Sequence, residues 1–342
     1  MHALQLLLVE DDIRLVESYK TVLADYVEER GRQLELHVVN SLDDAKRGLG
    51  KWIDAAIVDL NLGSGTSDGG EIIKQLKKYF RVPVAVLTGT PDDAENVPPV
   101  VGIFTKGEHR FDEVLDRLWS VHEIGLTKIM GGRGLLEERL NRVFLKNLLP
   151  TVDVWIRYAA KDRKRTERAL LRYALGHLVA DLEGDDTPCY PEEVYLAPPL
   201  DDSLETGSLV RCKARQTWHV VMTPACDLVI RKDGDPKTDM VVLAEVVPEV
   251  DVFDLLKANN RQKKKLRRNN DASYLHWLPK CHALEGGFVN FRRLDTVAWN
   301  ELDEKFDREN MRVAPSFIKD MVSRFSTFYA RQGQPEIVAS NS

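Results

Sequence analysis

The first 125 residues predict an α/β fold, in which helices cover both faces of a five-stranded parallel sheet. Two observations indicate it. Five short apolar runs, typical of buried strands, alternate with segments of helical periodicity. Polar side chains follow directly on four of these runs, where the carboxyl ends of parallel strands meet. Because ligands bind outside the carboxyl ends of such strands, this edge is the predicted functional site.

The predicted strands are the apolar runs, each bounded by polar or turn-forming residues. They cover residues 4–9, 34–39, 55–62, 82–89 and 101–106.

The predicted helices lie between and after these strands. In the first, Leu15, Tyr19 and Leu23 recur at four-residue spacing and share one face. In the second, Ser41 is the predicted N-cap, with Asp44 three residues on. The helical segments cover residues 13–26, 41–50, 69–80 and 109–125.

Five polar residues mark the predicted site. Glu10 and Asp11 follow the first strand, Asp59 the third, Thr88 the fourth and Lys106 the fifth. Three clustered carboxylates favour a hard divalent cation such as Mg²⁺, and a lysine with a hydroxyl group suits a phosphoryl group. Aspartate is a known phosphoryl-accepting nucleophile. The pattern therefore predicts phosphoryl chemistry at this edge.

The motifs LLVEDD (7–12), IVDLNL (57–62), VLTGT (86–90) and FTKG (104–107), in this order and spacing, resemble those of the receiver domain of bacterial response regulators. The resemblance covers residues 1–123 and implies a flavodoxin-like fold.

The resemblance also implies a role for each site residue. Asp59 would be the phosphoacceptor, Thr88 the switch hydroxyl, and Lys106 the partner of the phosphoryl oxygens. Mg²⁺ would be held by Glu10, Asp11, Asp59 and the backbone carbonyl of Asn61. A sensor histidine kinase would be the phosphodonor.

Several positions depart from the family pattern. Gly107 replaces the usual proline, and Ile103, with Phe104 beside it, replaces the usual aromatic residue three positions before the lysine. The loop 61–70 lacks its usual proline, and the interval 88–106 is too short and proline-rich for a full helix. We expect phosphorylation chemistry without the family's usual output face.

Residues 124–183 predict a helical connector. Two amphipathic segments, 134–149 and 163–182, are separated by Pro150, which is expected to end or kink the first. Their apolar stripes need a partner surface, which could be each other, the C-terminal domain or a second copy in a homodimer. The basic cluster, Arg163, Lys164, Arg165 and Arg168, is interpreted as a solvated face.

Residues 184–342 predict an α+β output domain of unknown activity, with a small antiparallel sheet or barrel. A segment rich in Pro and Asp, 184–203, is expected to form a surface loop, and 315–333 a closing amphipathic helix. Strand-like runs cover residues 208–214, 217–230, 240–250, 273–279 and 286–299.

Two features of this domain leave its activity open. His219, Cys226 and Asp227 are close in sequence and could serve a nuclease or toxin-like hydrolase, or Asp227 could simply bond within its turn. The basic run 257–268 has aromatic side chains nearby and could contact nucleic acid or form a solvated loop. The aromatic side chains are Tyr274, His276 and Trp277.

Composition is that of a globular protein, with 43% hydrophobic and 30% charged residues. The net charge is -6, and residues 1–125 carry about -8 of charge, which argues against nucleic-acid binding by that part. No apolar run is long enough to span a membrane, and no signal peptide is evident. The four cysteines have no zinc-site spacing and predict reduced thiols.

Together these features predict a cytoplasmic response regulator. It would be phosphorylated on Asp59 with Mg²⁺ and would control a C-terminal module that binds a protein partner. The alternatives are a phosphorylation-gated effector enzyme and a nucleic-acid-binding regulator that acts through residues 257–268.

Overall fold

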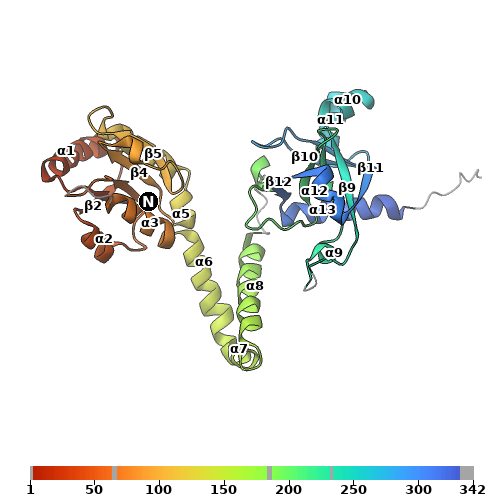
Figure 1. Cartoon of the computed structure of the whole chain (residues 1–342), viewed down its shortest axis with the longest axis horizontal. Coiled ribbons are helices and arrows are strands. Elements are labelled where there is room, and N and C mark those ends of the chain that lie inside the picture. The colour runs from red at the N-terminus through yellow and green to blue at the C-terminus, as the bar shows by residue number, and fades with distance from the viewer. Residues whose placement is uncertain (1–2, 64–67, 183–186, 232–233, 332–342) are drawn as a thin grey trace, which may run out of the picture. The chain divides into compact units, whose positions relative to one another are not determined.

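The computed structural model describes residues 3–63, 68–182, 187–231 and 234–331. The chain divides into two compact units, residues 1–185 (unit 1) and 186–342 (unit 2), shown in Figure 1. None of the described helices combines the length and hydropathy that crossing a membrane requires.

Unit 1 contains a five-stranded sheet in which every strand pairs in parallel with its neighbours, in the order β2-β1-β3-β4-β5. This is the flavodoxin-like order, so the predicted fold class is confirmed. The strands are β1 (Leu4–Val9), β2 (Leu34–Val39), β3 (Ala55–Val58), β4 (Val84–Thr88) and β5 (Val100–Thr105).

Helices cover both faces of this sheet. α1 (Ile13–Arg30) and α4 (Phe111–Glu123) pack on one face, and α2 (Leu42–Gly48) and α3 (Asp68–Tyr79) pack on the other. The predicted cap is present, since the Ser41 hydroxyl accepts the backbone N–H of Asp44 at 3.1 Å. Between β4 and β5 the chain forms only a 3₁₀ turn, Pro91–Asp93, so the expected loss of a helix is confirmed.

The predicted connector folds as an antiparallel helical hairpin. The first limb contains α6 (Leu135–Val143), a π turn (Phe144–Leu148), a 3₁₀ turn (Leu149–Thr151) and α7 (Val152–Ala159), and the second is α8 (Arg163–Leu182). Trp155 and Tyr173 lie with ring centroids 5.5 Å apart across the hairpin. The limb therefore continues past Pro150, and the sequence prediction missed α7.

A short helix, α5 (Leu126–Met130), joins α4 to this hairpin. Arg133 Nη2 lies 2.6 Å from the Asp54 carboxylate, and Arg81 Nη2 lies 2.5 Å from Glu137. These ion pairs tie the base of the hairpin to the sheet.

Unit 2 contains a seven-stranded sheet in the order β10-β11-β9-β8-β7-β12-β6, with antiparallel pairing throughout. The Tyr195 hydroxyl, on one edge strand, donates to the carbonyl of Pro279, just after the other, at 2.6 Å. The strands are β6 (Tyr195–Leu196), β7 (Ser208–Cys212), β8 (Trp218–Val221), β9 (Met240–Val247), β10 (Leu275–Leu278), β11 (Gly287–Ala298) and β12 (Phe306–Val313).

Helices pack against this sheet at three places. The closing helix, α13 (Pro315–Ala330), covers one face, as predicted. Leu228 and Leu302, from α9 (Ala225–Leu228) and α12 (Leu302–Lys305), pack with the core of the other face. Val252 and Phe253 of α10 (Glu249–Leu255) and Leu266 of α11 (Asn260–Arg267) form a further core with β10 and β11. Short 3₁₀ turns occur at Pro191–Val194 and Trp299–Glu301.

Unit 2 differs from the sequence prediction at several points, among them the strand β6 and the 3₁₀ turn Pro191–Val194 within the segment expected to form a loop. The strand expected over 217–230 ends at Val221, because Pro224 begins α9. The basic run forms the helix α11, which Asn259 caps, where a loop was the simpler expectation. The strand β12 was missed, because its charged residues conceal the buried Phe306 and Met311.

Candidate functional site: the acidic edge of the parallel sheet

Five of the predicted site residues lie at the carboxyl ends of the parallel strands. Glu10 follows β1, Asp59 follows β3 and Lys106 follows β5, while Thr88 is the last residue of β4. Carboxylate oxygens of Glu10, Asp11 and Asp59 lie within 4.8 Å of one another. The topology therefore brings together side chains that are up to 96 residues apart in the chain.

Lys106 joins two of these carboxylates. Its ammonium group lies 2.6 Å from Glu10 Oε2 and 2.7 Å from Asp59 Oδ2. Glu10 and Asp59 are buried, with 2% and 6% of their surface exposed, so the two charges depend on this cation. Burial raises the pKa of Glu10 even though the lysine opposes that shift. Burial alone would lower the pKa of Lys106, but its bonds to Asp59 and Glu10 outweigh burial and raise it.

A chain of hydrogen bonds connects Thr88 to Asp59. Thr88 is fully buried, and its hydroxyl oxygen accepts the backbone N–H of Thr90 at 3.3 Å. The Thr90 hydroxyl accepts the side-chain amide of Asn61 at 3.0 Å, and the backbone N–H of Asn61 donates to Asp59 Oδ1 at 3.4 Å. Thr90 was not singled out from the sequence, because only the fold places it beside Asn61.

Two glycines set the local geometry. A Cβ at Gly69, in the first turn of α3, would lie 1.9 Å from the backbone oxygen of Asp59, so only glycine fits there. The sequence reasoning missed this residue. Gly107 has a φ of 85°, which proline cannot adopt. The turn after Lys106 therefore requires a residue other than proline at position 107.

The donor set of this edge fits Mg²⁺. The three side chains offer hard carboxylate oxygens, which are the ligands that Mg²⁺ prefers. Asp11 is partly open to solvent, which leaves room for the water ligands that Mg²⁺ retains. One oxygen of Asp11, Oδ2, accepts the backbone N–H of Gly63 at 2.7 Å. Part of the glycine-rich loop, residues 64–67, lies outside the described residues.

In unit 2, the structure does not bring His219 and Asp227 into one site. Asp227 receives a bond from Lys237 at 2.6 Å, and this bond lowers its pKa. His219 is fully buried in the sheet, with Nε2 3.0 Å from the Asp295 carboxylate and Nδ1 3.1 Å from the carbonyl of Thr217. The Cys226 thiol donates to the carboxylate of the neighbouring Asp227 at 3.7 Å. Among the described residues, His219 and Asp227 therefore have separate partners, Asp295 and Lys237.

The aromatic neighbours of the basic run have partners within unit 2. Arg292 lies over the Tyr274 ring at 3.8 Å, and the Trp277 indole donates to Glu249, which also pairs with Arg267. His276 is buried, and burial lowers its pKa to about 4. The aromatic side chains are thus held within the fold and do not form a stacking platform for bases.

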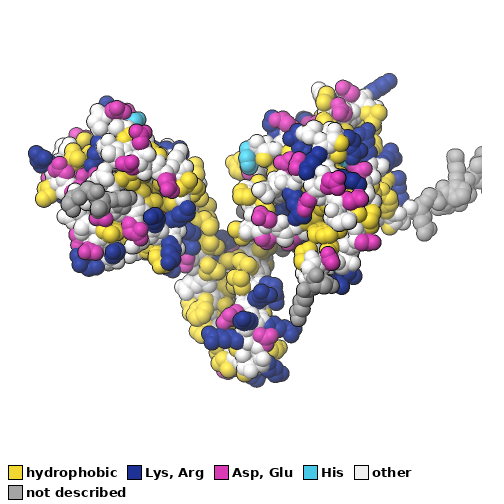
Figure 2. Space-filling model, in the orientation of Figure 1, with side chains coloured by type: hydrophobic (Ala, Val, Ile, Leu, Met, Phe, Trp, Pro, Cys, Tyr) yellow, Lys and Arg dark blue, Asp and Glu magenta, His cyan; other side chains and the backbone are white. Residues whose placement is uncertain are grey.

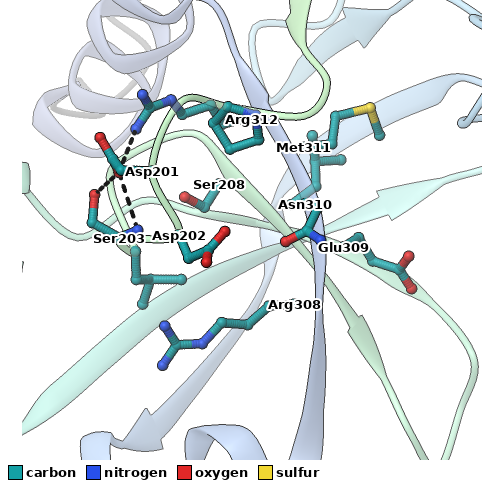
Figure 3. Close-up of a pocket in the computed structure, with 12 residues that line it drawn as sticks. Asp201, Asp202, Ser203, Ser208, Arg308, Glu309, Asn310, Met311 and Arg312 are labelled. Atoms are coloured by element: carbon teal, nitrogen blue, oxygen red, sulfur yellow. Dashed lines mark hydrogen bonds and ion pairs between the residues drawn. The ribbon is translucent and has the colours of Figure 1, made fainter. Parts of the chain in front are cut away.

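A small surface pocket of unit 2 lies between the segment 199–204 and β12, and Figure 3 shows its lining. The two arginines that line it are already paired. Arg312 lies 2.7 Å from Glu205, and Arg308 lies 2.7 Å from Asp303. Asp201 accepts the backbone N–H of Ser203 at 3.1 Å. Both arginines of the pocket are therefore engaged in ion pairs within unit 2.

No protein-family model and no curated protein matches the chain. Among solved structures, a response regulator receiver domain (CheY-like) from Methylobacillus flagellatus is similar at 23% identity, over 35% of this chain and 99% of that one, with a TM-score of 0.29. The non-phosphorylated HemR receiver domain from Leptospira biflexa is similar at 22% identity, over 34% and 93%, with a TM-score of 0.28.

A third solved structure was determined with Mg²⁺-BeF. It is the response regulator TrrA from Thermotoga maritima, similar at 18% identity over 34% of this chain and 98% of that one, with a TM-score of 0.27. The similarity of all three concerns the fold, and the region that it covers is the N-terminal part of unit 1. The sheet order by itself shows that this part of the chain has the flavodoxin-like fold that the sequence predicted.

Proposed function

We propose that the chain is a two-component response regulator whose unit 1 accepts a phosphoryl group on Asp59. The observation that carries this proposal is the placement of the Asp59 carboxylate. It lies 2.7 Å from the Lys106 ammonium group and within a cluster of three carboxylates at the carboxyl edge of the sheet. A nucleophilic carboxylate, a cation site and a fixed lysine are the parts that phosphoryl transfer needs.

Each residue of the acidic edge would have a separate role in phosphoryl transfer. An Asp59 carboxylate oxygen attacks the phosphorus of a phosphohistidine, and the bond between phosphorus and the imidazole nitrogen breaks. Glu10, Asp11 and Asp59, with the backbone carbonyl of Asn61, would hold Mg²⁺, which when bound neutralises the charge of the phosphoryl oxygens. Lys106 adds a second positive charge.

Thr88 would report the modified state. Its hydroxyl lies at the end of the hydrogen-bond chain through Thr90 and Asn61 that begins at Asp59. A phosphoryl group on Asp59 adds acceptor oxygens near this chain, which gives the Thr88 hydroxyl a new partner. The resulting shift of the loop after β4 would be the signal. A sensor histidine kinase in the cytoplasm is the proposed donor.

For unit 2 we propose binding to a protein partner. His219 and Asp227 do not share a site, and the aromatic side chains near α11 are held within the fold. The first observation argues against the effector enzyme, and the second argues against nucleic-acid binding through aromatic stacking. Both favour an output in which unit 2 binds another protein.

Mg²⁺ is expected to stabilise unit 1 through Asp11. At a concentration ten times its dissociation constant, the metal should raise the free energy of unfolding by about 1.4 kcal/mol. Asp11→Asn should lose most of this gain, because one ligand charge is removed. Asp12→Asn is the matched control, because Asp12 caps α1 and asparagine caps equally well. Hydrogen exchange of β1 and β3 amides, with and without Mg²⁺, measures the effect. Equal Mg²⁺ protection in the two variants would exclude Asp11 as a ligand.

A further inference from the structure

The connector exposes a large amount of apolar surface. Sixteen of the thirty-one exposed large hydrophobic side chains of the described chain lie between residues 126 and 182. Figure 2 shows hydrophobic side chains along this hairpin. Each is about half exposed, so together they present on the order of 1,000 Å² of apolar surface. Soluble monomers rarely expose contiguous apolar patches above a few hundred Å².

This surface has the periodicity of a helix bundle. On the first limb, four exposed side chains are spaced by four, three and four residues, which is the heptad spacing of helices that pack on other helices. They are Leu145, Leu149, Val152 and Ile156, and we name them the first seam. The π turn has more residues per turn than an α-helix, and the 3₁₀ turn has fewer. Because the two deviations oppose each other, the heptad spacing is kept across them and the four side chains remain exposed.

The second limb repeats the pattern. Its side chains again follow the spacing four, three, four, and three of them are at least 50% exposed. They are Leu171, Leu175, Leu178 and Leu182, and we name them the second seam. The two limbs are antiparallel and in contact. A partner that packs on both seams is therefore expected to present helices whose apolar side chains have the same heptad spacing.

The described part of unit 2 does not present such a partner. Its exposed large hydrophobic residues are scattered over loops and short elements, and its longest described helix, α13, exposes only Tyr329 among them. The hairpin of a second copy does carry the matching seams. A two-fold dimer uses the same patch on both subunits, so a hairpin whose two antiparallel limbs carry the same spacing can pack on its own copy. The apolar surface of the connector as a whole, of which the seams supply seven of the sixteen exposed side chains, is of the size that a standard stable interface buries, roughly 800 Å² per partner.

We propose that two copies of this chain associate through the connector, with the first and second seams of one hairpin packed on those of the other. The interface lies outside the acidic edge, so it does not depend on phosphorylation of Asp59. The interface would take the place of the usual receiver output face. In this chain that face lacks its helix, because only a 3₁₀ turn lies between β4 and β5.

The oligomeric state of the full-length chain tests this proposal. Sedimentation analysis of wild type should give twice the chain mass of 38.9 kDa. Leu149→Gln with Leu175→Gln should raise the dimer dissociation constant at least ~100-fold, because two buried leucines are lost from each subunit. The matched control is Lys146→Gln with Arg172→Gln, at exposed positions of the same limbs but outside the seams. Circular dichroism verifies that helix content is kept, which glutamine favours.

The control should dimerise as tightly as wild type. A monomeric wild type at all accessible concentrations overturns the proposal, whether unit 2 or a different protein then covers the seams. Equal dimerisation of the leucine variant and its control also overturns it. The mass of the wild type decides the question by itself, even where a variant does not fold. The phosphorylation of Asp59 is measured separately, so the failure of one proposal does not entail the failure of the other.

Discussion

Lys106→Met is expected to cost unit 1 about 3 kcal/mol of stability in Mg²⁺-free buffer. The substitution leaves Glu10 and Asp59 as two buried carboxylates without the ammonium group that lies within 2.7 Å of both. Added Mg²⁺ should restore much of the loss, because it supplies positive charge to the same carboxylates. Hydrogen exchange of the β1 and β3 amides in the full-length chain reports the local free energy of opening.

The matched control for this variant is Lys74→Met. The Lys74 ammonium group is largely exposed and lies 3.8 Å from Glu71 on the surface of α3, so its removal should change stability by less than about 1 kcal/mol. If Lys106→Met proves as stable as Lys74→Met without metal, the buried charge cluster does not depend on Lys106 as described.

Gly69→Ala is expected to displace the start of α3 and to cost on the order of 2–4 kcal/mol. Its Cβ would overlap the backbone oxygen of Asp59 and lie 2.7 Å from the Cα of Leu60, and backbone atoms cannot rotate away as a side chain can. Because the clash is with Asp59 itself, the rate of phosphorylation should also fall. Hydrogen exchange of α3 and β3 and the rate of phosphoryl gain are the two measurements.

Gly176→Ala provides the control for a glycine-to-alanine change within a helix. A Cβ at Gly176, in α8, meets no atom within 4 Å, so alanine should stabilise the helix by up to about 1 kcal/mol. A Gly69→Ala variant that behaves like Gly176→Ala would show that α3 is free to move away from Asp59 at little cost.

The flavodoxin-like fold of the N-terminal part could be predicted from the sequence because its signals are local. The central strands β3 and β4 are continuous apolar runs, and a polar site residue directly follows or ends each of them, Asp59 after β3 and Thr88 at the end of β4. Contacts across strands were not predictable in the same way. The bond from Asn61 to Thr90 and the close approach of Gly69 to Asp59 join residues from different elements, and nothing in the local sequence marks them.

Unit 2 was predicted less completely, for physical reasons that particular elements show. In β12, two buried residues, Met311 and Val313, follow an irregularity in the pairing with β7 between Arg308 and Arg312, so strict alternation is lost. The proximity of His219 to Asp227 in sequence did not indicate proximity in space. His219 lies within the sheet on β8, whereas Asp227 lies on α9 beyond Pro224.

Phosphorylation of Asp59 is the most direct test of the proposed function. Wild type, Asp59→Asn and the control Asp12→Asn would be incubated with acetyl phosphate and Mg²⁺, and the intact mass of each would be measured. We predict that wild type and Asp12→Asn gain the mass of one phosphoryl group and that Asp59→Asn gains none. A wild type without added mass, or an Asp59→Asn variant that gains as much, would contradict the assignment of Asp59 as the phosphoacceptor.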